Sequence, residues 1–304
     1  MNSRTLANAL LLLVLLGFIG FYISTKNKTL DIQRLTSLSL IEINRIQIPR
    51  NDKTDIILHK NTSVAGEAIW HMVKPYTIKA HQFRVNTLLG LSQTPINESY
   101  NINTLRLQDY ALDKPRARII FNSSEISFGK NNPLNNKRYL KIDNKLALVN
   151  DEIYPLVSAQ AATFVDLRLL PDKQISALTL PDIKIQKTDT AHWKSASKTI
   201  TNNALSADQI QTLLDNWRSA QAFAVHRYMP RKKLGMIKIT FDTGDINFKL
   251  TDDDPWLILA RPDLGIEYHL HSSLKQQLFG PFSSNAQPID EVPSQVEPSG
   301  VDDA

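Results

Sequence analysis

The 304-residue sequence contains no cysteine. This absence excludes a disulfide framework, thiolate metal sites and cysteine nucleophiles, and in an exported protein it is more typical of a bacterial envelope than of a eukaryotic secretory route. The Gly-x-Ser-x-Gly, His-Glu-x-x-His and phosphate-loop signatures of common enzymes are also missing. No dense basic run with interleaved aromatic residues occurs, so we expect no nucleic-acid partner. We also expect no cofactor.

One long hydrophobic run is present. It begins at Leu6 and ends at Ile23, and Asn8 is its only clearly polar residue. Eighteen residues at about 1.5 Å each make roughly 27 Å of helix, close to the hydrocarbon thickness of a bilayer. Bulky Tyr22 stands where cleavage after Ser24 would need a small residue. We therefore predict an uncleaved single-pass membrane anchor, with a cleaved signal peptide as the alternative.

The charges beside this run do not settle its orientation. Lys26, Lys28 and Arg34 outnumber Arg4, and such residues favour the cytoplasm. A single amino-terminal span followed by a large polar region nevertheless commonly exports that region. We expect the body on the extracytoplasmic (periplasmic) side of a bacterial inner membrane.

Composition divides the chain into five parts. Residues 1–24 form the expected anchor and residues 25–38 a short stalk. Residues 284–304 contain five acidic residues and no lysine or arginine, and they are rich in proline and serine, which predicts a disordered acidic tail. The remaining parts, residues 39–170 and 171–283, are expected to be two α+β repeats.

The two repeats share one order of features. In each copy, strand-like stretches lead to a tryptophan, Trp70 or Trp193, and a helix, four short strands and a closing helix follow. The closing helix of the first copy is expected over about residues 152–169. The clearest alignment has a constant offset of 120 residues and pairs Phe121, Ile126 and Phe128 with Phe241, Ile246 and Phe248.

Local patterns define the fold class. Residues 236–241 alternate apolar and polar side chains, which indicates a half-buried strand. Ser206 and Gln209 form a capping box before a helical stripe of Ile210, Leu213, Leu214 and Trp217. We predict an α+β fold: an internally duplicated meander of antiparallel strands with helices packed on one face, preceded by one transmembrane helix.

Several short motifs point to a family. They are Trp70 with Pro75, the run Tyr110-Ala-Leu-Asp-Lys-Pro115, Phe128-Gly129 before Asn132-Pro133-Leu134, and Arg138-Tyr-Leu-Lys141. Over roughly residues 65–260 the chain resembles a bacterial family catalogued as domain of unknown function 4340. The resemblance implies an envelope component, in some cases encoded beside an exporter of the ATP-binding-cassette type. It supplies no catalytic residues.

The loop from residue 129 to residue 138 is the first candidate site. Its glycine, asparagines and cations suit a phosphate or carboxylate ligand, although the same residue types also make an ordinary hairpin turn. The candidate ligand-binding residues are Gly129, Lys130, Asn132, Asn135, Lys137 and Arg138.

The matching loop of the second copy has the opposite charge. Asp252, Asp253 and Asp254 offer carboxylate oxygens to a calcium ion, although their spacing is not that of a known calcium loop and a solvated turn is the alternative. His269 and His271 lie two apart on an expected strand. They therefore share a face and are a second metal hypothesis that lacks a third ligand.

The sequence favours a non-enzymatic binding or scaffold module at the membrane surface, an accessory subunit of an envelope or ABC-type transport complex. The alternative is an envelope hydrolase that cleaves a polysaccharide or peptide polymer with dispersed acidic residues. A sensor that closes over a soluble ligand is a third hypothesis.

Overall fold

The computed structural model describes residues 11–20, 33–62, 67–96, 98–188, 192–197 and 205–280. Residues 11–20 are helical. Within the described residues, no helix is long and apolar enough to cross a membrane. The two ends of the predicted span (residues 6–10 and 21–23), most of the predicted stalk and the predicted acidic tail lie outside the described residues.

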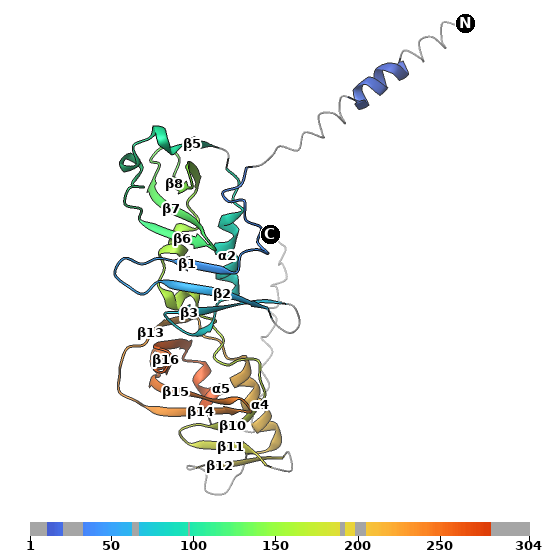
Figure 1. Ribbon diagram of the computed structural model, residues 1–304. Helices are drawn as coiled ribbons and strands as arrows, with labels where there is room; N and C mark the ends of the chain where they lie inside the picture. The colour runs from blue at the N-terminus through green and yellow to red at the C-terminus, as the bar shows by residue number, and fades with distance from the viewer. Residues whose placement is uncertain are drawn as a thin grey trace, which may run out of the picture. The chain divides into compact units, whose positions relative to one another are not determined.

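The chain divides into two compact units, residues 1–166 and 167–304, whereas the sequence placed the junction after residue 170. The first unit contains a sheet of nine strands among its described residues, in the spatial order β4-β3-β2-β1-β6-β7-β8-β9-β5 (Figure 1). Its strands are β1 (Arg45–Ile48), β2 (Ile56–Thr62), β3 (Ala68–Lys74), β4 (Ile78–Lys79), β5 (Ser99–Asn101), β6 (Ala117–Phe121), β7 (Ser124–Asn131), β8 (Lys137–Ile142) and β9 (Lys145–Asn150). Its helices are α2 (Gln82–Ser92), α3 (Tyr154–Ser158) and the 3-10 turns η1 (Ile102–Thr104), η2 (Leu107–Tyr110) and η3 (Ala161–Phe164).

The second unit contains a sheet of eight described strands in the order β12-β11-β10-β14-β15-β16-β17-β13. The strands are β10 (Ile175–Thr179), β11 (Ile183–Lys187), β12 (Trp193–Ser197), β13 (Ala224–Arg227), β14 (Gly235–Phe241), β15 (Gly244–Asp252), β16 (Trp256–Arg261) and β17 (Ile266–His271). Its helices are α4 (Ala207–Ser219) and α5 (Leu274–Phe279). The named strand pairs of both sheets are antiparallel. The predicted antiparallel strands with a few packed helices are therefore confirmed, as an α+β or β-rich fold.

The two sheets have the same strand order. Apart from the short β4, each strand of the first sheet has a counterpart at the same place in the second, so that β1 corresponds to β10, β6 to β14 and β5 to β13. The hairpins β6–β7 and β14–β15 also share a register, because Ile119 faces Ile126 just as Ile239 faces Ile246. These positions are the ones that the 120-residue offset aligns.

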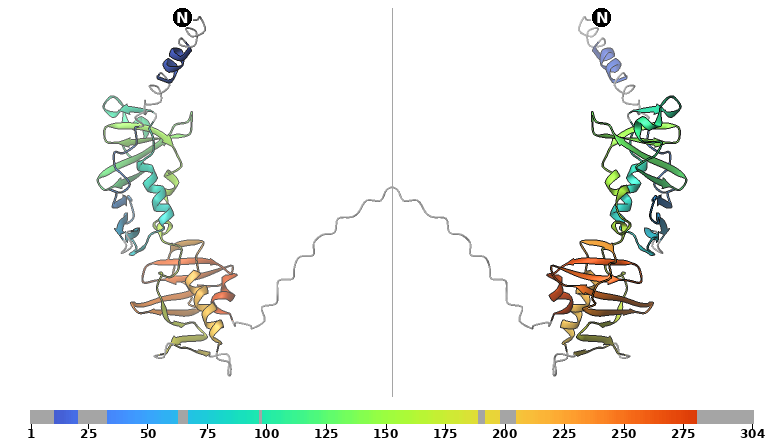
Figure 2. Two further views of the ribbon diagram at one scale, coloured as in Figure 1. Left: turned by 90° about the vertical axis from the view of Figure 1, so that its right-hand side faces the viewer. Right: turned by 90° about the vertical axis from the view of Figure 1, so that its left-hand side faces the viewer.

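One face of each sheet is covered by helices. In the second unit, Ser206 and Gln209 form the expected capping box at the start of α4. The buried side of α4 ends in Trp217, whose ring centroid lies 6.3 Å from that of Phe248 on β15. The indole Nε1 of Trp217 donates a hydrogen bond of 3.1 Å to the carbonyl oxygen of Leu278 in α5. Figure 2 shows α4 and α5 against the sheet.

The closing helix of the first unit is much shorter than expected. Instead of a helix over residues 152–169, the structure has α3 and the separate turn η3. Ala159 and Gln160 between them have extended backbone angles. Val165 then forms an isolated antiparallel bridge with Ala80. The helix ends at Ser158 because the following residues turn back to pair with the sheet edge beside Ala80.

Residues 33–38, which the sequence assigned to the stalk, lie against the first unit. The backbone N–H groups of Leu35 and Thr36 donate to the carbonyl oxygens of Thr94 and Ser92 at 2.9 and 3.1 Å. The side chains of Leu35 and Thr36 are buried. This segment therefore extends the first unit beyond the expected boundary at residue 39.

Candidate functional site

The loop from residue 129 to residue 138 is the hairpin between β7 and β8. Two of its asparagines use their side chains to build the turn. The Oδ1 atom of Asn132 accepts from the N–H of Leu134 at 3.0 Å, and that of Asn135 accepts from the N–H of Lys137 at 3.1 Å. Of the candidate cations in this hairpin, Lys130 is exposed. Turn formation thus accounts for the asparagines.

Arg138 forms a buried ion pair. Its Nε and Nη2 atoms donate to the two carboxylate oxygens of Asp151 at 2.5 and 2.7 Å, and Nη1 donates to the carbonyl oxygen of Gly129 at 2.5 Å. The guanidinium carbon lies 3.7 Å from the centroid of the Tyr154 ring. The Arg138 side chain is only 5% exposed, so its donors serve the fold and are turned away from any ligand in the hairpin.

The three aspartates lie in the turn between β15 and β16. Asp252 Oδ1 accepts hydrogen bonds from the N–H groups of Asp253 and Asp254 at 2.9 and 3.5 Å, and the Asp253 carboxylate pairs with Lys275 at 2.5 Å. In the described part of the chain, no three histidine, aspartate or glutamate side chains are grouped to hold a metal ion. The calcium hypothesis therefore gains no support from this geometry.

A buried carboxylate that the sequence did not single out lies in the second unit. The side chain of Glu267 on β17 is 0% exposed. Its oxygens accept from Arg231 Nη2 at 3.1 Å and from the N–H of Met229 at 3.1 Å, and Oε1 lies 2.9 Å from His269 Nε2. The segment 228–234 thus crosses this face of the sheet and is held there by Glu267.

A small aromatic and histidine cluster extends from this carboxylate. The rings of His226 and His269 have centroids 4.5 Å apart. His271, the other candidate metal ligand, packs on Phe223 with a centroid distance of 4.9 Å. Burial, reinforced by nearby His269, lowers the pKa of His226 from 6.5, and Glu267 opposes this shift. The neutral form of His226 is therefore favoured.

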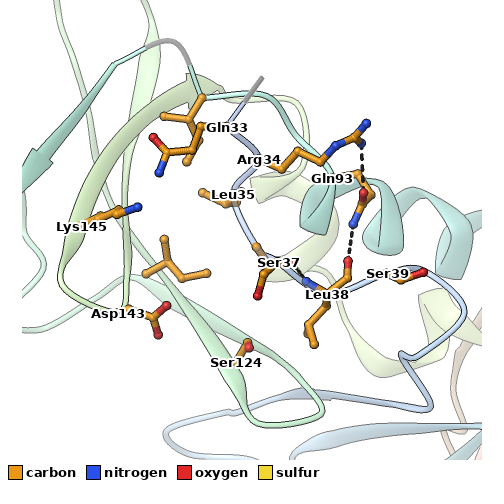
Figure 3. Close-up of a pocket in the computed structure, with 13 residues that line it drawn as sticks. Gln33, Arg34, Leu35, Ser37, Leu38, Ser39, Gln93, Ser124, Asp143 and Lys145 are labelled. Carbon is orange, nitrogen blue, oxygen red and sulfur yellow. Dashed lines mark hydrogen bonds between the residues drawn. The ribbon is translucent and has the colours of Figure 1, made fainter. Parts of the chain in front are cut away.

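A cleft of about 980 Å³ lies in the first unit (Figure 3). It is formed where residues 33–39 pass the end of α2 and the turns that follow β6 and β8. Gln93 bridges its wall, accepting from Arg34 Nη1 at 3.0 Å and donating to the carbonyl oxygen of Leu38. The lining residues are Gln33, Arg34, Leu35, Thr36, Ser37, Leu38, Ser39, Gln93, Ile96, Ser124, Ile142, Asp143 and Lys145.

The chemistry of this cleft is that of a polar binding surface. Figure 3 shows Asp143 and Lys145 at one wall and Arg34 at the other. Serine hydroxyls and glutamine amides line the rest of the cleft. Such a lining offers hydrogen bonds to a polar ligand or to a peptide segment.

A family model described as domain of unknown function (DUF4340) matches residues 70–235, more than half of the chain. The chain belongs to this family. The DUF4340 match begins at Trp70 on β3 and ends at Gly235 on β14, so it includes parts of both units. No curated protein and no solved structure matches the chain.

The structure explains why two of the family-like motifs occur together. A Cβ atom at Gly129 would lie 2.3 Å from the carbonyl oxygen of Tyr110 and 3.1 Å from the Leu112 side chain. The run that begins at Tyr110 therefore packs directly on the backbone of Gly129. Only glycine permits this approach, so in this DUF4340 protein the two motifs form one contact.

Proposed function

We propose that this DUF4340 protein is a single-pass, membrane-anchored binding or scaffold module whose body lies on the extracytoplasmic side of a bacterial inner membrane. It would act as an accessory subunit of an envelope or ABC-type transport complex. The observation that carries the proposal is the helix at residues 11–20, whose large apolar side chains are all 45–69% exposed. A helix that is apolar on every side needs an apolar environment, and a bilayer supplies one.

The body supports a binding role in two ways. The two sheets have the same strand order, from which we infer that they arose by internal duplication. Two repeated α+β units provide two surfaces for contacts with a partner. The 980 Å³ cleft adds a polar recognition surface close to the amino-terminal segment.

Glu267 favours binding over hydrolysis. It is the only carboxylate among the buried described residues, and a general acid in a glycosidase needs access to its substrate. The Glu267 carboxylate instead accepts hydrogen bonds from Arg231 and from the backbone of Met229. Its role is to hold the segment 228–234.

Alkaline phosphatase fused to the carboxyl end of the full chain tests the anchor and its orientation. We expect an active fusion that stays in the membrane fraction. The matched control deletes residues 1–24 and should give an inactive, non-membrane fusion. An inactive fusion of the full chain would contradict the extracytoplasmic placement, and an active fusion released from the membrane would contradict the anchor.

Purification of the tagged full chain in mild detergent tests the subunit role. We expect reproducible co-purification of at least one envelope protein, and recovery of this chain when that protein carries the tag. The control is the same chain with a shuffled sequence over residues 6–23 of equal hydrophobicity, which should retain its partner if the body makes the contact. Recovery of this chain alone would contradict the subunit role.

A further inference from the structure

A second cleft of about 280 Å³ lies at one end of the first sheet. It is formed where the loop after β1, residues 49–53, meets residues 115–118, which lead into β6. Ser158 at the end of α3 completes it. At roughly 30 Å³ per water molecule, the volume corresponds to about nine waters. It therefore has room for an anionic group and the atoms to which that group is attached.

The lining of this cleft is strongly cationic. Arg50, Lys53, Arg116 and Arg118 face a single lining carboxylate, that of Asp52. Lys53 and Arg116 form no ion pair or side-chain hydrogen bond with another described residue, and both are exposed. Their charges are therefore uncompensated within the described part of the chain.

The two other cations are only partly compensated. Arg118 reaches Glu125 at 3.8 Å, with both side chains about 40% exposed, and such a surface pair contributes little. Arg50 donates through Nη1 and Nη2 to the carbonyl oxygens of Ser158 and Ala159 at 3.2 and 2.5 Å. These bonds fix the guanidinium at the wall. Burial lowers the pKa of Arg50 from its usual value, and the nearby carboxylate of Asp55 opposes this shift without cancelling it.

The corresponding corner of the second unit is closed. There, β10 and β11 are joined by a short turn at Pro181, and a Cβ atom at Gly235, the first residue of β14, would lie 2.7 Å from the Pro181 ring. The proline thus fills the place where the first unit has its cleft. The longer β1–β2 loop with its cations is a feature of the first unit alone.

We propose that this cleft binds the phosphate group of an anionic ligand. Planar guanidinium groups match the oxygens of phosphate, and three of the four cations are arginines. A phosphate monoester carries more charge than a carboxylate and so better compensates four cations, and a phosphodiester still offers two charged oxygens to the guanidinium groups. The group can belong to a soluble phosphate ester or to a phospholipid headgroup, and the proposal does not depend on the membrane anchor.

Calorimetric titration of the full chain in uncharged detergent tests this proposal. The probes are glycerol phosphate, short-chain phosphatidylglycerol, and short-chain phosphatidylcholine as a zwitterionic reference. Binding of glycerol phosphate identifies a soluble ester as sufficient. Binding of phosphatidylglycerol without glycerol phosphate or phosphatidylcholine identifies an anionic headgroup that needs its acyl chains. Either result supports phosphate binding in this cleft if the variants described next have the expected affinities.

The cleft variant combines Lys53→Ala with Arg116→Ala. Both side chains are exposed, so the fold should be retained and affinity should fall at least about tenfold. The matched control combines Lys184→Ala with Lys194→Ala, which removes two exposed cations from the second unit and should leave affinity unchanged. A third variant, Arg116→Lys with Arg118→Lys, keeps the charge but removes two planar groups and should lose affinity to an intermediate extent. No binding of either phosphate probe by the wild type, or an equal loss in the control variant, would overturn the proposal.

Discussion

The two units have sheets of the same strand order, and in each a connecting segment covers the equivalent face. The chemistry that attaches this segment differs between the two units. In the first unit the segment between β5 and β6 packs on β9 through an apolar cluster of Leu112, Leu146 and Leu148, with Tyr110 and Tyr139 at its side. In the second unit the segment between β13 and β14 is held on β17 by Glu267 and Arg231. Leu148 faces Tyr139 on the neighbouring strand, and Glu267 faces Ala260. One topology thus tolerates either an apolar or an ionic attachment at this place.

The difference has a physical consequence. An apolar contact loses stability in proportion to the side-chain atoms removed. A buried ion pair is asymmetric, because removal of one partner leaves a charge without compensation, whereas replacement of both partners by apolar residues is often neutral or stabilising. The second unit should therefore be the more sensitive to single substitutions at its attachment and the less sensitive to a paired one.

The largest effect is expected for Arg231→Met. The fully buried Glu267 carboxylate would keep only His269 and one backbone N–H as partners. We expect the free energy of unfolding of the second unit to fall by about 3–5 kcal/mol, measured by hydrogen exchange of the β17 amides. The double variant Arg231→Met with Glu267→Leu imitates the first unit and should return close to wild type. A double variant as unstable as the single one would show that the two units are not attached in equivalent ways.

A substitution in the apolar attachment of the first unit should lower stability somewhat less. Leu112→Ala removes a side chain that is 97% buried and is expected to lower the stability of the first unit by about 2–4 kcal/mol. Hydrogen exchange of the β9 amides measures this loss. Leu134→Ala, at a side chain that is 92% exposed, is the control and should change stability by less than about 0.5 kcal/mol. Similar effects of the two substitutions would contradict the cluster's role.

Alanine substitution of two glycines, which lie at corresponding ends of the two units, should have smaller effects on stability. Gly129→Ala drives a Cβ against the backbone oxygen of Tyr110, and we expect a loss of about 1–3 kcal/mol. Gly235→Ala meets the ring of Pro181, which lies on a turn that can shift, so its cost should be smaller. Thermal unfolding of the two variants compares them. A greater loss for Gly235→Ala would show that the proline corner is the more rigid of the two.

The smallest effect concerns pH. Burial is the first cause of a lowered pKa for His226 in the second unit and for His81 in the first, where Arg84 adds to it. The unfolded chain then binds more protons than the folded one, so stability is complete above the unfolded pKa of about 6.5 and declines as pH falls below it. Hydrogen exchange at pH 7.5 and 5.5 should show this decline in both units. His226→Gln should reduce it in the second unit only, and an unchanged decline would remove His226 as its source.

Regular patterns in the sequence predicted most of the sheet. The alternation that ends at Phe241 and the capping box at Ser206 depend on neighbours along the chain, and both appear in the structure. The short strands β5 and β13 were missed, because a segment of three or four residues has too little periodicity to distinguish it from a connection.

The site residues were harder to predict because their partners are distant in the sequence. The residues around Arg138 in the sequence are the same whether its side chain binds a ligand or Asp151. Only the fold, in which the chain after β9 brings Asp151 beside Arg138, identifies the partner. Glu267, His269 and His271 occupy alternate positions along β17, a pattern that is typical of a solvent-exposed strand face. The one available signal was Arg231, a cation in the connection that crosses that face. The cationic cleft joins residues 49–53 with residues 115–118, which no local pattern connects.

The shared register of the β6–β7 and β14–β15 hairpins has a consequence for biosynthesis. Either hairpin could pair with the neighbouring strands of the other sheet, because the apolar residues that face each other within the two hairpins are spaced alike. Repeated domains that resemble each other in this way are prone to misassembly between copies. We expect that the first sheet must be complete before the second hairpin emerges on the side of the membrane where the body folds, and that this order of emergence protects the chain from exchanging its own parts.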